Sequence, residues 1–245
     1  ALFWLHMAHA ACVAALIDGL GGLCPNVYTR PFDSLRDLEA ANGLLLEEPF
    51  VAALHLDVDP LPLVPRLRRM HAVISERFPE PQWPAAMRQM TRFEYRYFSS
   101  GEELEWRLAV AEEMISRGSP PAAVFYLRFW AYVLARVPMV HQRAREGVDV
   151  SFVRPSKAIR PELERLCPEV LRDLSSVLGG DRELRRDDLS RSLEHLDRLR
   201  HRTLALLAAR GFQLDGLRQW RPYEPVRRPA PPGPKPELAK EHAHG

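Results

Sequence analysis

A glutamate between two arginines is the part of this sequence best suited to chemistry. The segment TRFEYRYF, residues 91–98, alternates charged and aromatic residues and is rich in strand-forming side chains, which predicts a β-strand. Alternation along that strand would place four side chains on one face: Arg92, Glu94, Arg96 and Phe98. If this face lines a cleft, the arginines keep Glu94 ionised and bind an anionic substrate, while Glu94 transfers protons. The alternative is a solvated ladder of charges on a sheet surface, worth about 1 kcal/mol or less.

A second candidate lies in the apolar segment 120–136, which is hydrophobic on almost every side and is expected to be a central helix. Arg128, Tyr132 and Arg136 recur every fourth residue and therefore share one stripe of that helix. A buried arginine needs a partner. That partner is either an acidic side chain on the preceding helix or a bound carboxylate or phosphate, so Arg128 and Tyr132 are candidate substrate-binding residues.

A third candidate is the basic, proline-bounded segment RPSKAIRP, residues 154–161. Lys157 is the only lysine outside the C-terminal tail, so a Schiff base, if the chemistry needs one, would have to use it. Together with Arg154 and Arg160, Lys157 could also form an anion-binding loop or simply a solvated basic loop. Binding of a phosphorylated ligand through this loop is one alternative function.

The sequence offers little support for a metal or a cofactor. His6 and His9 are three residues apart but have no defined third ligand, and no CxxC motif occurs. There is no GxGxxG, P-loop or GxSxG motif either. We therefore expect neither a metal nor a cofactor. Among the other histidines, His71 follows two arginines and is a candidate to point into a cleft beside Arg69.

Part of the chain, residues 60–100, resembles a known family of enzymes. Glu94 precedes the aromatic Phe98 by four residues, and Arg69 lies upstream in RLRRMH. In these features the segment resembles the small bacterial cyclases that condense tryptophan with an aldehyde in a Pictet–Spengler reaction to form β-carbolines. The resemblance implies that Glu94 is the general acid/base, that an arginine holds the amino acid's carboxylate, and that aromatic rings sandwich the indole. It also implies a homodimer that works without a cofactor.

The elements that must position these residues are mostly helices. Apolar periodicity, prolines and glycines predict helices at about 1–19, 34–42, 62–78, 101–117, 120–136, 161–179 (interrupted at Pro168) and 182–210, with strands at 50–58 and 91–98. Ser100 and Glu103 form an S-x-x-E capping box ahead of the fourth of these helices. We expect a single α+β, mainly helical domain over residues 1–221, followed by a proline-rich tail at 222–245.

Composition narrows the classes of function. The 245 residues carry a formal net charge of only +2, which gives no bulk attraction to nucleic acid. No apolar run reaches the roughly 18 residues of a membrane span. Three scattered cysteines argue against a disulfide framework and are typical of a reducing cytoplasm.

These observations favour a cytoplasmic, cofactor-independent acid/base enzyme acting on a small aromatic or anionic substrate, with Glu94 at its centre. The alternative is a non-catalytic helical interaction module, in which the long helix at 182–210 and the proline-rich tail bind a partner. Neither interpretation involves nucleic acid or a membrane.

Overall fold

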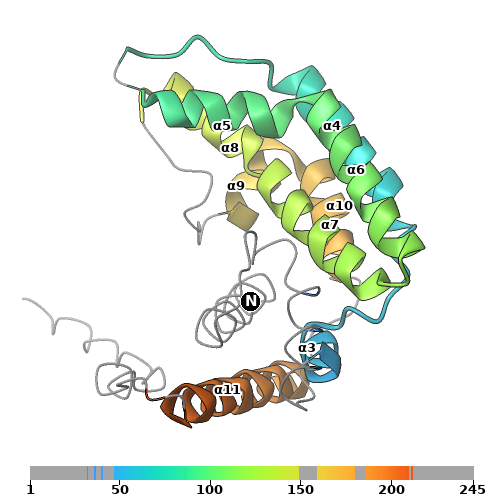
Figure 1. Cartoon of the computed structure of the whole chain (residues 1–245). Helices are drawn as coiled ribbons and strands as arrows, with labels where there is room; N and C mark the ends of the chain where they lie inside the picture. The colour runs from blue at the N-terminus through green and yellow to red at the C-terminus, as the bar shows by residue number, and fades with distance from the viewer. Residues whose placement is uncertain are drawn as a thin grey trace, which may run out of the picture.

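The computed structural model describes residues 47–85, 87–148, 159–179 and 186–209, together with Phe32, Arg36, Ala40 and Gly211. Every regular element within these residues is an α-helix (Figure 1). The protein is therefore mainly helical. The predicted helix at 1–19, the loop with Lys157 and the proline-rich tail at 222–245 lie outside the described residues.

The helices are labelled as in Figure 1. In chain order they are α3 (Glu47–Leu54), α4 (Leu63–Arg77), α5 (Gln89–Ser99), α6 (Gly101–Ser116), α7 (Pro120–Leu134), α8 (Val137–Arg145), α9 (Ile159–Leu166), α10 (Pro168–Val177) and α11 (Arg186–Ala209). Helices α4, α6, α7, α10 and α11 lie where apolar periodicity predicts them, and the break between α9 and α10 falls at the predicted proline.

The capping box predicted before α6 is present. The Glu103 backbone N–H donates a hydrogen bond to Ser100 Oγ at 3.3 Å, which satisfies one of the free donors at the start of the helix. At the other end, Gly118 takes a positive φ of 76°, a conformation that glycine adopts without steric cost. Local signals in the sequence thus determine both ends of α6.

Helix α7 is the centre of the core. Twelve of its fifteen residues are buried, and α4, α6 and α10 pack around it. By length and composition, the helical stretch Pro120–Arg145 could cross a membrane, but 94% of its most apolar window is buried inside the protein. Such burial is typical of the central helix of a folded domain.

The break between α7 and α8 follows from Pro138. A proline in a helix cannot donate the hydrogen bond that would reach back to the carbonyl of Leu134. Arg136 accordingly serves as the residue before α8, and Pro138 lies in the first turn of that helix. The break places the buried Arg136 at the junction of two helices rather than within one.

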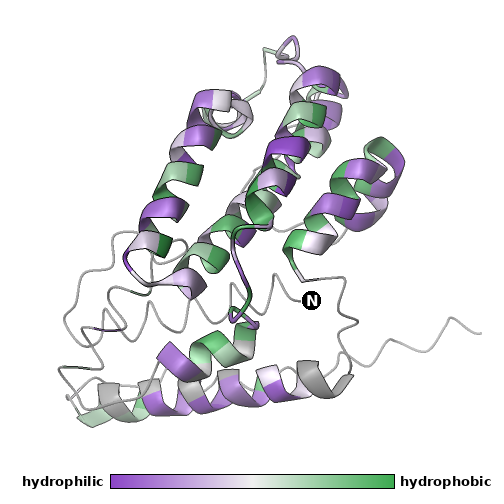
Figure 2. Ribbon diagram, turned by 90° about the vertical axis from the view of Figure 1, so that its right-hand side faces the viewer, coloured by the Kyte–Doolittle hydropathy of each residue, from purple (hydrophilic) through white to green (hydrophobic). Residues whose placement is uncertain are grey.

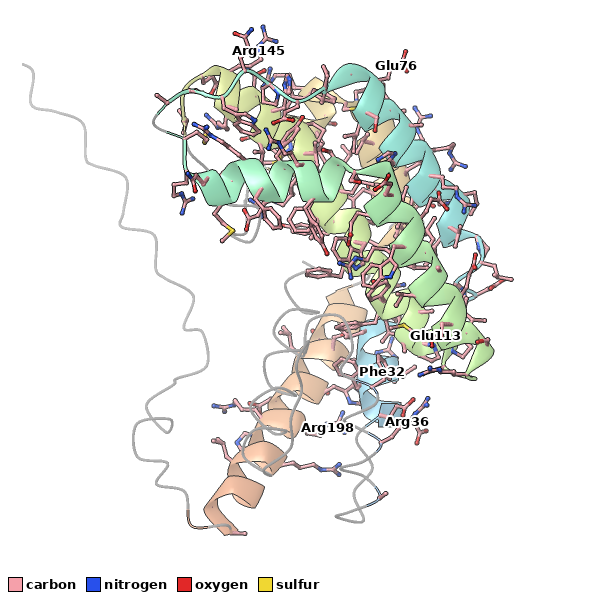
Figure 3. All side chains as sticks on the ribbon, turned by 45° about the horizontal axis from the view of Figure 1, so that its top comes forward. Phe32, Arg36, Glu76, Glu113, Arg145 and Arg198 are labelled. Carbon is pink, nitrogen blue, oxygen red and sulfur yellow. The ribbon has the colours of Figure 1, made fainter. Side chains whose placement is uncertain are left out.

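Helix α11 lies across the end of the bundle and packs against the short helix α3 (Figure 1). Figure 2 shows that α11 is mostly hydrophilic along its length. The residues that join this end to the bundle include Phe32 and Arg36, which Figure 3 places beside α3 and near Glu113. Phe32 packs edge-on against Phe50 of α3 and Phe125 of α7.

The strand predicted at 50–58 is wrong, because residues 47–54 form α3. Two alanines favour the helix, and Phe50 and Leu54, four residues apart, both point into the core. Helix α3 ends with His55 at a φ of 50°. The Leu56 N–H then bonds to the Val51 carbonyl at 3.0 Å, the 6→1 bond of a helix C-cap in which glycine usually occupies the place of His55.

The strand predicted at 91–98 is also wrong, because this segment lies within α5. Its aromatic residues fit a helix as well as a strand: Thr91 and Tyr95, four residues apart, are each only 1% exposed. Tyr95 also donates a hydrogen bond of 2.7 Å to the carbonyl of Phe78 at the end of α4. Burial of this helical stripe outweighs the strand preference of the individual residues.

Candidate functional site

The helical geometry of α5 separates Glu94 from the two arginines expected to flank it. Residues two apart on an α-helix point to nearly opposite sides, because each residue turns by about 100°. Arg92 and Arg96 therefore do not share a face with Glu94, and the predicted charge ladder is wrong. Glu94 instead lies on the same side of α5 as Tyr97 and Phe98.

Arg92 and Arg96 instead bind the connector that precedes α5. Arg92 donates to the carbonyl of Pro84 at 2.8 Å, and Arg96 donates to Glu80 at 2.7 Å. Glu80 also accepts a hydrogen bond of 2.7 Å from the indole N–H of Trp83. These contacts hold the start of α5 in place.

Two further candidates, Arg69 and His71, are engaged elsewhere on α4. Arg69 forms an ion pair of 2.7 Å with Asp173 of α10. His71 Nε2 lies 2.9 Å from the carbonyl of Ser99, at the end of α5. These contacts tie α4 to α10 and to the α5–α6 turn, and neither brings its residue to Glu94.

Arg128 has a partner, but it is not the predicted acid of the preceding helix. Its guanidinium donates to the carbonyl of Leu54 at 2.7 Å and to that of Val177 at 3.2 Å. These carbonyls lie at the C-terminal ends of α3 and α10, where carbonyls lack partners within their own helix and a positive charge is favourable. Burial lowers the pKa of Arg128 to about 10, while Asp57 acts to raise it, so Arg128 remains charged at neutral pH.

Glu94 keeps a cationic neighbour, although from a different element. Arg136, only 4% exposed at the α7–α8 junction, is within electrostatic reach of Glu94. Burial lowers the pKa of Arg136, and a hydrogen bond with Tyr132 acts in the opposite direction. Glu94 and Glu162 of α9 also raise it, because each favours the charged guanidinium. Tyr132, a predicted site residue, therefore lies beside Arg136, with the guanidinium carbon 5.9 Å from its ring centroid.

The Glu94 side chain is half-buried and is not used in the fold. Within the part of the chain that the structure describes, its carboxylate forms no hydrogen bond and no ion pair of its own. Three of the five acidic side chains of the following helix α6 have such partners: Glu103, Glu105 and Glu113. Glu94 is therefore a carboxylate with a cation nearby and both oxygens available.

An aromatic layer extends from Glu94 along α5 to α7. Phe93 and Tyr97 stack with ring centroids 5.8 Å apart and planes 17° apart. Tyr97 meets Phe98 edge-on at 5.2 Å, and Phe98 lies 5.6 Å from Trp130 of α7. The buried indole N–H of Trp130 has no acceptor among the described residues. The predicted Phe98 thus belongs to a continuous surface of rings beside Glu94.

The far end of this layer holds a group of residues that sequence analysis missed. Arg107 of α6 lies between the rings of Trp106 and Trp130, each 4.1 Å from its guanidinium carbon. It also donates to Glu103, to Tyr97 and, at 3.1 Å, to Tyr126. Burial raises the pKa of Glu103, whereas the ion pair with Arg107 favours its charged form. The only sequence signal was the Glu103–Arg107 spacing of four residues, which is common on exposed helices.

No cluster of three or more potential metal ligands occurs among the residues that the structure describes. The expectation of no cofactor stays a prediction. The alternative of anion binding by Arg154, Lys157 and Arg160 is not tested, because Arg154 and Lys157 lie outside the described residues. Comparison with protein families, with curated proteins and with solved structures finds no match to this chain.

Proposed function

We propose that the protein is a cofactor-independent acid/base enzyme of small-molecule metabolism, with Glu94 as the group that transfers protons. The substrate would be a small aromatic compound carrying an amine or an acidic group. Its ring would lie on the layer formed by Phe93, Tyr97 and Phe98. Its reacting atoms would face Glu94.

The observation that carries this proposal is the state of the Glu94 carboxylate. A half-buried carboxylate without hydrogen bonds costs stability, and most partly buried acids in folded proteins are paired, so an unpaired one is a candidate to meet a ligand. Arg136 places a positive charge within electrostatic reach of Glu94. A general base needs a carboxylate next to a surface that positions the substrate, and a well-placed one accelerates a reaction about 10²–10⁴-fold.

The specific reaction we propose is the condensation of an aromatic amino acid such as tryptophan with an aldehyde, which rests on the resemblance of residues 60–100 to Pictet–Spengler cyclases. The amine and the aldehyde form an iminium ion with loss of water, and the indole carbon then attacks that ion. The ring must finally lose a proton, which Glu94 would accept. Arg69, Arg92 and Arg96 contact Asp173, Pro84 and Glu80 and do not reach Glu94. Arg136 is the arginine within electrostatic reach of Glu94, so it is the candidate to attract the carboxylate of the amino acid.

The test is turnover by the full chain supplied with L-tryptophan and acetaldehyde near neutral pH, with product detected by mass spectrometry and the uncatalysed rate subtracted. Glu94→Gln keeps the shape of the side chain and removes its basicity. We expect it to lower turnover about 100-fold or more. Glu76→Gln, on the exposed side of α4 and labelled in Figure 3, is the matched control and should match the unaltered protein.

Unchanged turnover in Glu94→Gln would remove Glu94 from the chemistry. If the unaltered chain forms no product above the uncatalysed rate, the condensation is wrong. The remaining proposal is an acid/base enzyme that binds a small aromatic substrate on α5, and NMR titration with tryptophan tests it. It requires a saturable shift of the α5 amides in the unaltered chain.

A second candidate function is protein association through the same face. Met90, Phe93 and Trp106 are 62%, 61% and 52% exposed, and exposed apolar residues that gather in one area are typical of interaction surfaces. In this case the aromatic layer would pack against another protein, such as a second copy of the chain. The combined change of Phe93 and Trp106 to serine would then convert a dimer to a monomer in sedimentation analysis. A chain that is monomeric before the change would exclude self-association.

A further inference from the structure

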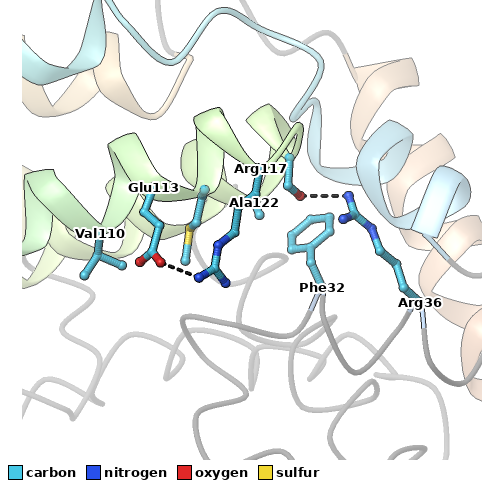
Figure 4. A pocket seen from close by; sticks show the side chains of 8 residues that line it. Phe32, Arg36, Val110, Glu113, Arg117 and Ala122 are labelled. Carbon is cyan, nitrogen blue, oxygen red and sulfur yellow. Dashed lines mark hydrogen bonds and ion pairs between the residues drawn. The ribbon is translucent and has the colours of Figure 1, made fainter.

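A small pocket lies far from Glu94, where the α6–α7 turn meets the segment before α3 (Figure 4). Its volume is about 110 Å³, room for about four water molecules or one small organic molecule. None of the residues used in the proposed function lines it. It is therefore a separate candidate for ligand binding.

The inner wall of the pocket is apolar. Phe32, Ala122 and Val110 are 2%, 4% and 7% exposed, and Met114 completes this wall. Such a surface excludes water and favours a short hydrocarbon body.

The rim is polar and carries two arginines. Arg36 is held in place: it donates to both oxygens of Glu47, at 2.8 and 3.1 Å, and to Ser119 Oγ at 2.9 Å. Because Ser119 Oγ accepts that bond, its own O–H hydrogen remains for another acceptor. Ser119 is buried and lines the pocket, so an acceptor bound there can receive this hydrogen.

Arg117 is the group that can exchange partners. It pairs with Glu113 one helical turn earlier, and both side chains are exposed, by 72% and 52%. An exposed pair of this kind contributes little to stability, so a carboxylate arriving from solvent can replace Glu113 at small cost. Figure 4 shows the Arg117 and Glu113 side chains together at one side of the pocket.

We propose that this pocket binds a small monocarboxylate with a short aliphatic body. The hydrocarbon part would lie against Phe32 and Val110. The carboxylate would accept hydrogen bonds from Arg117 and from the Ser119 hydroxyl. Because Phe32 and Arg36 precede α3 while the opposite wall belongs to α6 and α7, the bound acid would also hold these two parts of the chain together.

The test is an amide NMR titration of the full chain with sodium butyrate and with butyramide, its neutral analogue of similar size. We expect saturable shifts centred on the amides of residues 110–122 and of Phe32 and Arg36, with a Kd of about 1 mM for butyrate. Butyramide should bind about 5-fold more weakly, because it cannot pair with the exposed Arg117.

Arg117→Gln should weaken butyrate about 3- to 5-fold. It should fold normally because Arg117 is exposed. Arg145→Gln, at the opposite end of the molecule in Figure 3, is the control and should leave the Kd unchanged. The proposal is overturned if shifts do not saturate, if they centre elsewhere, if butyramide binds equally well, or if Arg117→Gln has no effect. None of these results bears on Glu94.

Discussion

Two buried arginines, one within α7 and one just after its end, have different partners. Arg128 of α7 and Arg136 at the α7–α8 junction are 6% and 4% exposed. Arg128 donates to backbone carbonyls at the ends of α3 and α10. Arg136 lies instead among side chains: Tyr132, with which it hydrogen-bonds, and the carboxylates of Glu94 and Glu162.

The comparison shows that the kind of partner distinguishes the two arginines: backbone carbonyls mark a structural arginine, and side-chain carboxylates mark one near a candidate site. Backbone carbonyls are fixed by the helices to which they belong, so Arg128 can only hold those helices together. A carboxylate side chain can change its protonation state and its contacts, and Glu94 has neither oxygen committed among the described residues. Burial alone would not have separated the two arginines.

The largest effect is expected at Arg128. Arg128→Met keeps the bulk of the side chain but leaves the carbonyls of Leu54 and Val177 without donors. We expect the free energy of unfolding to fall by about 3 kcal/mol, since each buried unsatisfied carbonyl costs about 1–3 kcal/mol and loss of the buried charge offsets part of the sum. Urea denaturation measures this change. The exposed control Arg145→Met should stay within about 0.5 kcal/mol, and a loss below 1 kcal/mol at Arg128 would contradict a structural role.

A smaller effect on activity is expected at Arg136. Arg136→Gln removes the positive charge within electrostatic reach of Glu94 and, in our proposal, of the substrate carboxylate. We expect the KM for tryptophan to rise about 10-fold at neutral pH, with a smaller change in kcat, because the bound amino acid loses its cationic partner. A purely structural arginine would change stability and leave KM in place, and that result would put Arg136 in the same class as Arg128.

The smallest effect is expected at the end of α3, beside the Arg128 contact. His55 holds a φ of 50°, where a residue with a Cβ is strained. His55→Gly should raise the free energy of unfolding by about 0.5–1 kcal/mol, because glycine adopts this conformation without that strain. Thermal unfolding monitored by circular dichroism measures the gain. A loss of stability would show that the His55 side chain contributes more than its backbone conformation costs.

Sequence analysis predicted the helices with strong apolar periodicity and clear ends. Helix α6 has its Ser100 cap and α7 has two prolines at its start, and both lie where they were predicted. Helix α5 was predicted wrongly as a strand. Its alternating aromatic residues match the two-residue period of a strand, but Thr91 and Tyr95, four residues apart, also form the buried stripe of a helix. Only packing against α7 and α8 decides between them.

The candidate site, like the fold, could be predicted from the sequence only in part. Glu94 and Phe98 could be singled out by residue type, and Tyr132 by its position on α7. The cation near Glu94 was predicted wrongly: the strand interpretation placed Arg92 and Arg96 beside it, and only the three-dimensional packing of the helices brings Arg136 within reach. The Trp106–Arg107–Trp130 stack was also hidden, since it joins two helices and its residues are not arranged as a motif along the chain.

The structure of the Glu94→Gln variant with bound tryptophan tests the central claim most directly. The account predicts the indole ring against Phe93 and Tyr97, with the amine within hydrogen-bond distance of residue 94. Tryptophan bound away from α5, for example in the pocket beside Phe32, would contradict it and leave Glu94 without a catalytic role.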